Sequence, residues 1–183
     1  MPRLIHLNGP SRVGKSTLAR RYVADHPRSL LLDLDVLAGL VDGWEDDFSA
    51  ALEVARSHAR ELARRHLLSG HDVVLPQLVT VHDREPDPAF EGTARSVGAT
   101  YVHVALLVDE EEHLRRVHGK RPTTAVEAHV QAALAEPGSD LVDRIRGHLE
   151  EYLLRHPATI RPDTTGLDED ATYLRLLDVL ATA

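Results

Sequence analysis

The chain has 183 residues, which is long enough for one compact α/β domain and short for two. It contains no cysteine, so a disulfide framework, a thiolate metal site and a thiol nucleophile are all excluded. The formal charge of −8 argues against general binding to nucleic acid or to an anionic membrane, because such proteins normally carry a basic surplus.

The apolar runs of the sequence bear on where the protein works. The longest of them, such as residues 104–108, are far shorter than the ~20 residues that a membrane-spanning helix needs. The first ten residues lack the charged-then-apolar layout of a signal peptide. These features predict a cytoplasmic protein with a single domain over residues 1–183.

Apolar strands and amphipathic helices alternate along the chain. The predicted elements, in order, are a strand over 4–8, a helix over 15–25, a strand over 29–35, a long helix over 44–68, a strand over 72–77, a short helix over 89–97, a strand over 100–108, a helix over 110–117, two helical segments separated at Pro137-Gly138, a short strand and loop over 158–166, and a closing helix over 168–180. This alternation predicts an α/β fold with a mainly parallel sheet.

A phosphate-binding motif follows the first strand. Residues 9–16 fit the pattern G-x-x-x-x-G-K-[ST], with every fixed position occupied and a strand and a helix on the required sides. The glycines allow close approach of the backbone, and successive N–H groups with the helix N-terminus attract phosphate. The sequence therefore predicts a nucleotide site made of Gly9, Pro10, Ser11, Arg12, Val13, Gly14, Lys15, Ser16 and Thr17. Lys15 is expected on the outer phosphates and the Ser16 hydroxyl on Mg²⁺, whereas Arg12 could face a lid or only solvent.

The rest of the chain narrows the class of nucleotide-binding protein. It contains no N-K-x-D string, which a GTPase would use to recognise guanine. A motor or AAA-type ATPase usually has an acid at the end of an apolar strand to hold Mg²⁺, but the third predicted strand ends in Pro76 and Gln77. Both absences favour phosphoryl transfer over a switch or a motor.

Two carboxylates follow the second apolar run. On a strand, Asp33 and Asp35 would leave the same face at the carboxyl end, where open α/β sheets bind their ligands. One carboxylate would then assist the Mg²⁺ shell, and the other would accept the proton of an attacking hydroxyl. The alternative is that one of them is a surface carboxylate or caps a helix that begins at Val36.

The stretches GPSRVGKST and LLLDLD, with a later arginine-rich segment, resemble the small P-loop kinases related to shikimate and gluconate kinases, and more closely the chloramphenicol phosphotransferase-like and zeta-toxin-like kinases. The resemblance implies a three-layer P-loop fold with about five parallel strands, helices on both faces and a small helical lid near residues 115–138. It implies ATP and Mg²⁺ as cofactors and transfer of the γ-phosphate to a hydroxyl of a small molecule. It matches Asp33-Leu34-Asp35 to the D-x-D of shikimate-type kinases and aligns Asp35 with the catalytic aspartate, which leaves Asp33 as the carboxylate expected to assist Mg²⁺.

The same resemblance suggests roles for residues after the fourth strand. Arg116 and Arg121 would close over the phosphates as catalytic lid residues, with Lys120 as a further nucleotide contact. The alternative is a solvated helix in which Glu111 or Glu112 pairs with Arg115 or Arg116. The loop that contains Thr164 would pass beside the adenine ring, although a plain turn explains it equally well.

Two other functions stay open at this stage. One is a toxin-type kinase that acts on a nucleotide-sugar, and the other is a nucleotide-binding regulatory protein with little catalysis. A polynucleotide kinase is disfavoured by the charge of −8. The sequence leaves the acceptor and the oligomeric state undetermined.

Overall fold

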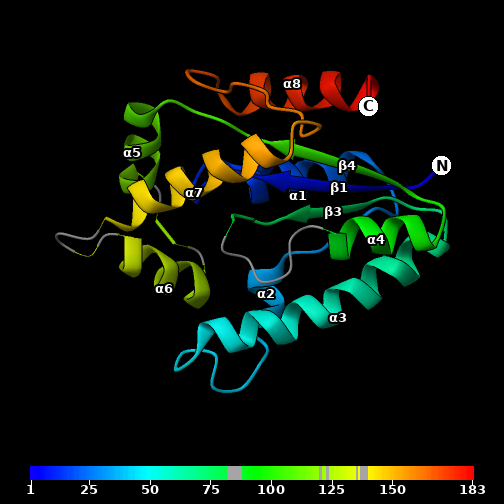
Figure 1. The fold of residues 1–183 in the computed structure, drawn as a ribbon, viewed down its shortest axis with the longest axis horizontal. Helices are drawn as coiled ribbons and strands as arrows, with labels where there is room; N and C mark the ends of the chain where they lie inside the picture. The colour runs from blue at the N-terminus through cyan, green and yellow to red at the C-terminus, as the bar shows by residue number, and fades with distance from the viewer. Residues whose placement is uncertain (82–87, 120, 123, 135, 137–139) are drawn as a thin grey trace.

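A computed structural model describes residues 1–81, 88–119, 121–122, 124–134, 136 and 140–183 of the chain. Its sheet has four parallel strands in the order β2-β3-β1-β4, of which β3, β1 and β4 are labelled in Figure 1. The strands are β1 (Arg3–Asn8), β2 (Leu30–Leu31), β3 (Val73–Pro76) and β4 (Thr100–Ala105). Because β1 has neighbours on both sides and buried residues on both faces, it forms the centre of the sheet.

Helices cover both faces of this sheet. On one face, α1 (Lys15–Asp25) and α8 (Glu169–Ala181) pack on Ile5 and Leu7 of β1. On the other face, α3 (Phe48–Leu68) and α4 (Pro88–Ser96) pack on Leu4 of β1 and on β3. The alternation of Leu4, Ile5 and Leu7 between two clusters follows from the two-residue period of a strand. The layers are therefore helix, sheet and helix.

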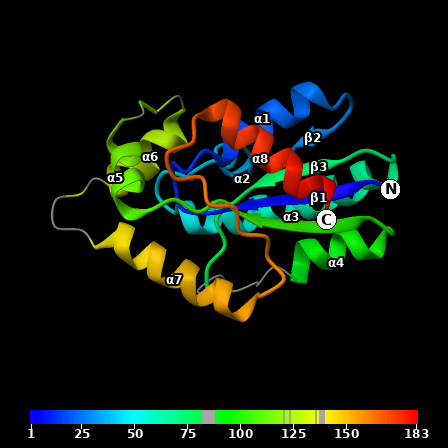
Figure 2. The ribbon, with the colours of Figure 1, turned by 90° about the horizontal axis from the view of Figure 1, so that it is seen from above.

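The remaining helices gather near the carboxyl ends of the strands (Figure 2). They are α2 (Leu34–Ala38), α5 (Glu110–Gly119), α6 (Ala125–Leu134) and α7 (Leu141–Arg155). An ion pair of 2.9 Å between Arg146 and Glu110 joins α7 to α5. No helix among the described residues is both long enough and apolar enough to cross a membrane.

The expected last strand is reduced to isolated bridges. Parallel bridges join Val104 to Ile160 and Leu107 to Asp163, so this segment runs beside β4 without forming a continuous ladder. The sheet therefore has four strands where about five are expected, and the α/β class with helices on both faces is confirmed.

Two further differences concern the region after β1. The second strand, expected over 29–35, ends at Leu31, and α2 begins at Leu34 because the side chain of Asp33 caps it by accepting from the backbone N–H of Asp35 at 3.1 Å. The long helix begins at Phe48 rather than at residue 44, because Asp47 caps it through a hydrogen bond from the N–H of Ala50. The apolar run Leu30 to Leu34 favours a strand past the Asp33 cap, and the helical spacing of apolar residues continues before the Asp47 cap, which explains the two errors.

Gly9 provides a stability prediction. Its φ is +135°, and a Cβ at this position would lie 2.7 Å from the carbonyl oxygen of Leu106. We expect Gly9→Ala to lower the free energy of unfolding by about 3 kcal/mol, through backbone strain and overpacking. Gly98→Ala is the control, since Gly98 also has a positive φ of +70° but no atom within 4 Å of the added Cβ. Urea unfolding of both variants measures the difference, and equal losses would contradict the steric explanation.

Candidate functional site

A cavity of about 880 Å³ opens at the carboxyl edge of the sheet. One part of its wall, here called the phosphate-loop half, comes from the motif, the start of α1, α5, and the loop before α8 with the start of that helix: Ser11, Arg12, Val13, Gly14, Lys15, Ser16, Thr17, Leu18, Glu112, Arg115, Arg116, Gly119, Leu167, Asp168, Glu169 and Thr172. The other part, called the Asp35 half, comes from α2, α3, the end of β3, α6 and α7: Leu34, Asp35, Phe48, Leu52, Arg56, Pro76, Gln77, Leu78, Thr80, Glu127, Val130, Ile145 and His148.

The motif forms a tight loop between β1 and α1. Gly9, Arg12 and Gly14 have φ values of +135°, +69° and +111°, so the chain reverses in a way that needs two glycines. Lys15 Nζ folds back over the loop and donates to the carbonyl oxygens of Gly9 and Pro10, at 2.8 Å each. Gly9 and Pro10 do not line the cavity, whereas the predicted residues from Ser11 to Thr17 do.

Two side chains from outside the motif hold the loop in place. The Arg12 guanidinium donates to Oε1 of Gln131 on α6 at 2.8 Å, so Arg12 faces the predicted lid. The Nε2 of His113 on α5 lies 2.9 Å from the carbonyl oxygen of Ser11. Burial lowers the pKa of His113, which favours a neutral ring that donates to that carbonyl. The phosphate loop is thus anchored to both α5 and α6.

Asp35 lies in the first turn of α2 and lines the cavity opposite Lys15. Desolvation of its carboxylate by the surrounding protein raises its pKa to about 6, and the charges of Asp33 and Glu127 add to this effect against Lys15. The pKa of Lys15 is lowered to about 8 by burial, although the nearby charges of Asp35 and Asp33 oppose the shift. A carboxyl group with a pKa near neutral pH and an ammonium group with a lowered pKa therefore share one cavity. Such a pair of shifted pKa values is typical of a reactive site.

Asp33 is the residue predicted to assist the Mg²⁺ shell. Its side chain caps α2, and Asp33 is absent from the cavity wall. The prediction that Asp33 and Asp35 leave one face of a strand is wrong, because both lie beyond the end of β2. In an early turn of a helix, two residues of separation turn the side chains to different sides.

Arg116 lies in the wall of the phosphate-loop half. Its Nε donates to Glu112 at 2.7 Å, and its other nitrogens donate to the carbonyl oxygens of Val13, Thr164 and Leu167 at 3.1, 3.3 and 3.4 Å. Arg115 also bonds to Glu112. The helical pairing considered from the sequence is therefore present for both arginines, and Arg116 in addition ties the phosphate loop to the loop before α8.

Thr164, which was predicted to lie beside the adenine ring, is not part of the cavity wall. Thr164 is fully buried, and both its N–H and its hydroxyl donate to the carbonyl oxygen of Leu107, so it braces the loop and does not reach the cavity. Leu167, Asp168, Glu169 and Thr172 line the wall instead. Arg121 is exposed and does not contribute to the cavity wall, and Lys120 lies outside the described residues.

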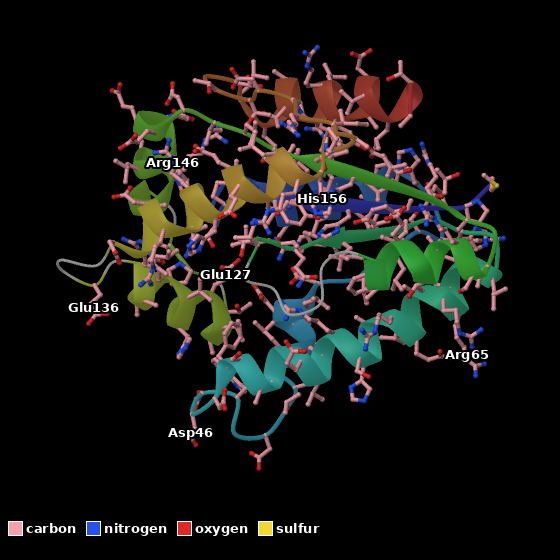
Figure 3. All side chains as sticks on the ribbon, viewed as in Figure 1. Asp46, Arg65, Glu127, Glu136, Arg146 and His156 are labelled. Carbon is pink, nitrogen blue, oxygen red and sulfur yellow. The ribbon has the colours of Figure 1, made fainter. Side chains whose placement is uncertain are left out.

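Sequence reasoning missed several residues of the Asp35 half. Arg56 on α3, with 16% of its side chain exposed, donates to Glu53 at 2.7 Å, and its Nε lies 3.1 Å from the Gln77 amide oxygen when that amide is turned to accept. Glu127 lies on the side of α6 that faces the sheet (Figure 3). The one available signal for Arg56 was its place four residues after Leu52, on the apolar stripe of α3.

The site offers an oxygen ligand of the kind that Mg²⁺ uses when it binds together with a nucleotide. The Ser16 residue lines the cavity, and Mg²⁺ normally uses one or two protein oxygens while phosphates and waters complete its shell. Among the described residues, no group of three or more His, Asp or Glu side chains could hold a metal ion by itself. The residues present therefore fit a metal that arrives with a phosphate ligand, with Ser16 as the predicted protein ligand.

Comparisons with known proteins agree with this geometry. A family described as AAA domain matches residues 4–138. The structure of thymidylate kinase from Candida albicans is 13% identical, covers 99% of this chain and 92% of that chain, and has a TM-score of 0.61. The tunicamycin resistance protein of Deinococcus radiodurans is 13% identical, with 99% and 96% covered and a TM-score of 0.61. Comparison with curated protein sequences gives no match.

A third similar structure is shikimate kinase from Bacteroides thetaiotaomicron, which is 20% identical, with 98% of each chain covered and a TM-score of 0.54. At these identities the similarity concerns the fold. The resemblance to P-loop kinases seen in the motifs is confirmed at that level over almost the whole chain.

Proposed function

The chain belongs to the family described as AAA domain. Because its fold is similar to that of thymidylate and shikimate kinases, we propose that it is an ATP-dependent kinase that transfers the γ-phosphate to a hydroxyl of a small molecule. One observation carries the proposal: Asp35 and Lys15 line the same cavity and influence each other's charge. A carboxylate with a pKa near 6 is suited to accept a proton from a hydroxyl at neutral pH.

The proposed step assigns each half of the cavity a role. ATP lies along the phosphate-loop half, where backbone N–H groups, Lys15 and the N-terminus of α1 bind its phosphates. The acceptor hydroxyl faces Asp35, which takes its proton as the oxygen bonds to the γ-phosphorus and the bond to the β-phosphate oxygen breaks. The products are a phosphate ester, ADP and one proton. Mg²⁺, held partly by Ser16, would neutralise charge on the phosphates.

Hydrolysis or simple binding of ATP is less consistent with the site. β3 ends at Pro76, and Gln77 follows it, so no acid stands at the strand end where an ATPase would use one. The Asp35 half also extends well beyond the motif, over elements from α2 to α7, and an ATPase would not require it. This second half is the feature expected of an enzyme with a separate phosphate acceptor.

We further propose that residues 1–183 act as one domain in which α5 and α6 cover the nucleotide. The bonds from Arg12 to Gln131 and from His113 to Ser11 support this, since each joins the phosphate loop to one of the two helices. Arg116 would act from α5 by neutralising phosphate charge once ATP competes for its backbone partners.

The test is a transfer assay with γ-labelled ATP, Mg²⁺ and a library of small alcohols, read out as labelled organic phosphate. Transfer that the parent shows and Lys15→Met lacks would support the proposal. ATP binding with no labelled product from any alcohol would favour the regulatory alternative, and labelled nucleotide-sugar alone would favour the toxin-type one.

The pH profile of transfer gives a separate prediction. Asp35 must be deprotonated to act as base, so kcat/KM should rise with pH through about 6 and level off above it. Because the charge of Asp33 contributes to the raised pKa of Asp35, Asp33→Asn should move this rise to lower pH without lowering the plateau. A profile that stays flat across about pH 5 to 7 would contradict the assignment of the base.

A further inference from the structure

The Asp35 half has apolar walls from several separate elements. Phe48 and Leu52 come from α3, Leu78 follows β3, Val130 comes from α6 and Ile145 from α7. Each of these side chains is only partly buried, although all line one cavity. Apolar side chains that converge on a cavity without filling it are typical of a site for an apolar ligand group.

The charges of this half also favour an uncharged ligand. Among the described part of its wall, the carboxylates are Asp35 and Glu127, the guanidinium is that of Arg56, and His148 adds an imidazole. Arg56 is engaged with Glu53 at 2.7 Å and lies beside the Gln77 amide. Two carboxylates and one paired cation would repel a phosphorylated acceptor, whose dianionic group would need several unpaired cations or N–H groups.

The polar groups of the half are suited to hydroxyls instead. Asp35 and Glu127 accept hydrogen bonds, and Gln77 and Thr80 both donate and accept them. They lie on α2, α6 and the segment after β3, while the apolar side chains of α3 and α7 complete the wall. A ligand that satisfies both sets has a hydroxylated end and an apolar body.

We infer that the phosphate acceptor is an uncharged alcohol with an apolar body, which packs between α3, α6 and α7 while its hydroxyl faces Asp35. This inference rests on the proposed kinase function and specifies its substrate class. The reaction converts the alcohol and ATP into a phosphate monoester and ADP, and the hydroxyl proton leaves through Asp35. The apolar body supplies binding energy, and the carboxylates exclude anionic competitors.

Three probes that share a primary hydroxyl test the inference: phenylethanediol, glycerol and glycerol phosphate. With ATP and Mg²⁺, we expect kcat/KM for phenylethanediol to exceed that for glycerol by about 10-fold or more, from burial of the phenyl ring. Glycerol phosphate should be poorer than glycerol. Calorimetric titration in the presence of a non-hydrolysable ATP analogue should give the same order of affinity.

Variants locate the effect in the cavity. Leu52→Asn keeps the size of the side chain but makes the wall polar, and we expect it to reduce the preference for phenylethanediol over glycerol to about 3-fold or less. The control is Leu62→Asn, also on α3 but 47% exposed and outside the cavity wall, which should keep the full preference. A thermal unfolding curve for each variant confirms that it is folded.

The outcomes separate the substrate class from the proposed function. Equal affinity and kcat/KM for phenylethanediol and glycerol, or a preference for glycerol phosphate, would overturn the inference while leaving a kinase. A preference for phenylethanediol in binding alone would support the acceptor site even where transfer to this probe is slow. Failure of the parent to bind the ATP analogue would instead overturn the proposed function.

Discussion

Asp35→Asn is expected to lower kcat for phosphoryl transfer by about 10²- to 10⁴-fold, the range for loss of a general base. The asparagine keeps the size of the side chain and its place at the cavity, but it cannot take the proton of the acceptor hydroxyl. ATP affinity should change little, because the phosphate loop and Lys15 remain. The measurement is the steady-state rate of ADP release with the acceptor present, together with calorimetric binding of an ATP analogue.

The stability of this variant helps to interpret the rate. The folded-state pKa of Asp35 is raised from 3.8 to about 6, so its favourable contribution to stability is present below pH ~3.8 and is lost as pH rises through about 6. At pH 7 the ionised carboxylate therefore opposes folding, and the neutral asparagine relieves this. Asp35→Asn should be at least as stable as the parent at pH 7, so a loss of activity could not be attributed to unfolding.

Asp33→Asn is the matched control for Asp35→Asn. It removes the same charge two residues away, and asparagine caps a helix about as well as aspartate. Because Asp33 does not line the cavity, the plateau rate should stay within about threefold of the parent. If Asp33→Asn lost as much activity as Asp35→Asn, Asp33 would be needed in the metal shell after all and the present assignment would be wrong.

The sequence predicted the phosphate-loop half well because its chemistry is local. The motif forms its site from consecutive backbone groups between β1 and α1, so spacing alone locates Ser11 to Thr17 at the cavity. The central strands were predicted because their buried runs are continuous, as in β1 and β3. The end of β2 was misjudged, since Leu30 to Leu34 suits a strand while the Asp33 cap already starts α2. The last predicted strand was also wrong, because its segment makes only isolated bridges to the chain at and after β4.

The Asp35 half depends on long-range packing, which a single sequence does not reveal. Arg56 and Glu127 line one cavity from α3 and α6, although they are more than seventy positions apart along the chain.

The charge pattern of the sequence also could not show which arginine after β4 lies at the cavity. Arg116 lies in the charged helix α5 and Arg121 follows it, and of the two Arg116 donates to the backbone carbonyls of Val13, Thr164 and Leu167. The two arginines therefore differ in their tertiary contacts, which a single sequence does not reveal.

Lys15→Met is the second substitution with a large expected effect, a fall in kcat/KM for ATP of about 10²- to 10³-fold, as when one donor to the transition-state charge is removed. Methionine keeps the length of the side chain but removes the ammonium group. Lys15 Nζ donates to the carbonyl oxygens of Gly9 and Pro10, and in the proposed complex it turns to the outer phosphates. Both the KM for ATP and kcat should change, because the phosphate charge is present in the ground state and increases on transfer.

The comparison that isolates this effect is Arg20→Met, which removes a cation from the exposed face of the same helix. It should leave both constants near those of the parent. The pKa of Lys15, about 8, adds a pH test: ATP binding to the parent should weaken as pH rises above 8, because the ammonium group then loses its proton. In Lys15→Met this weakening should disappear. If it persisted, the group that titrates near pH 8 would have to be sought elsewhere in the cavity, and Lys15 would not be the principal cation on the phosphates.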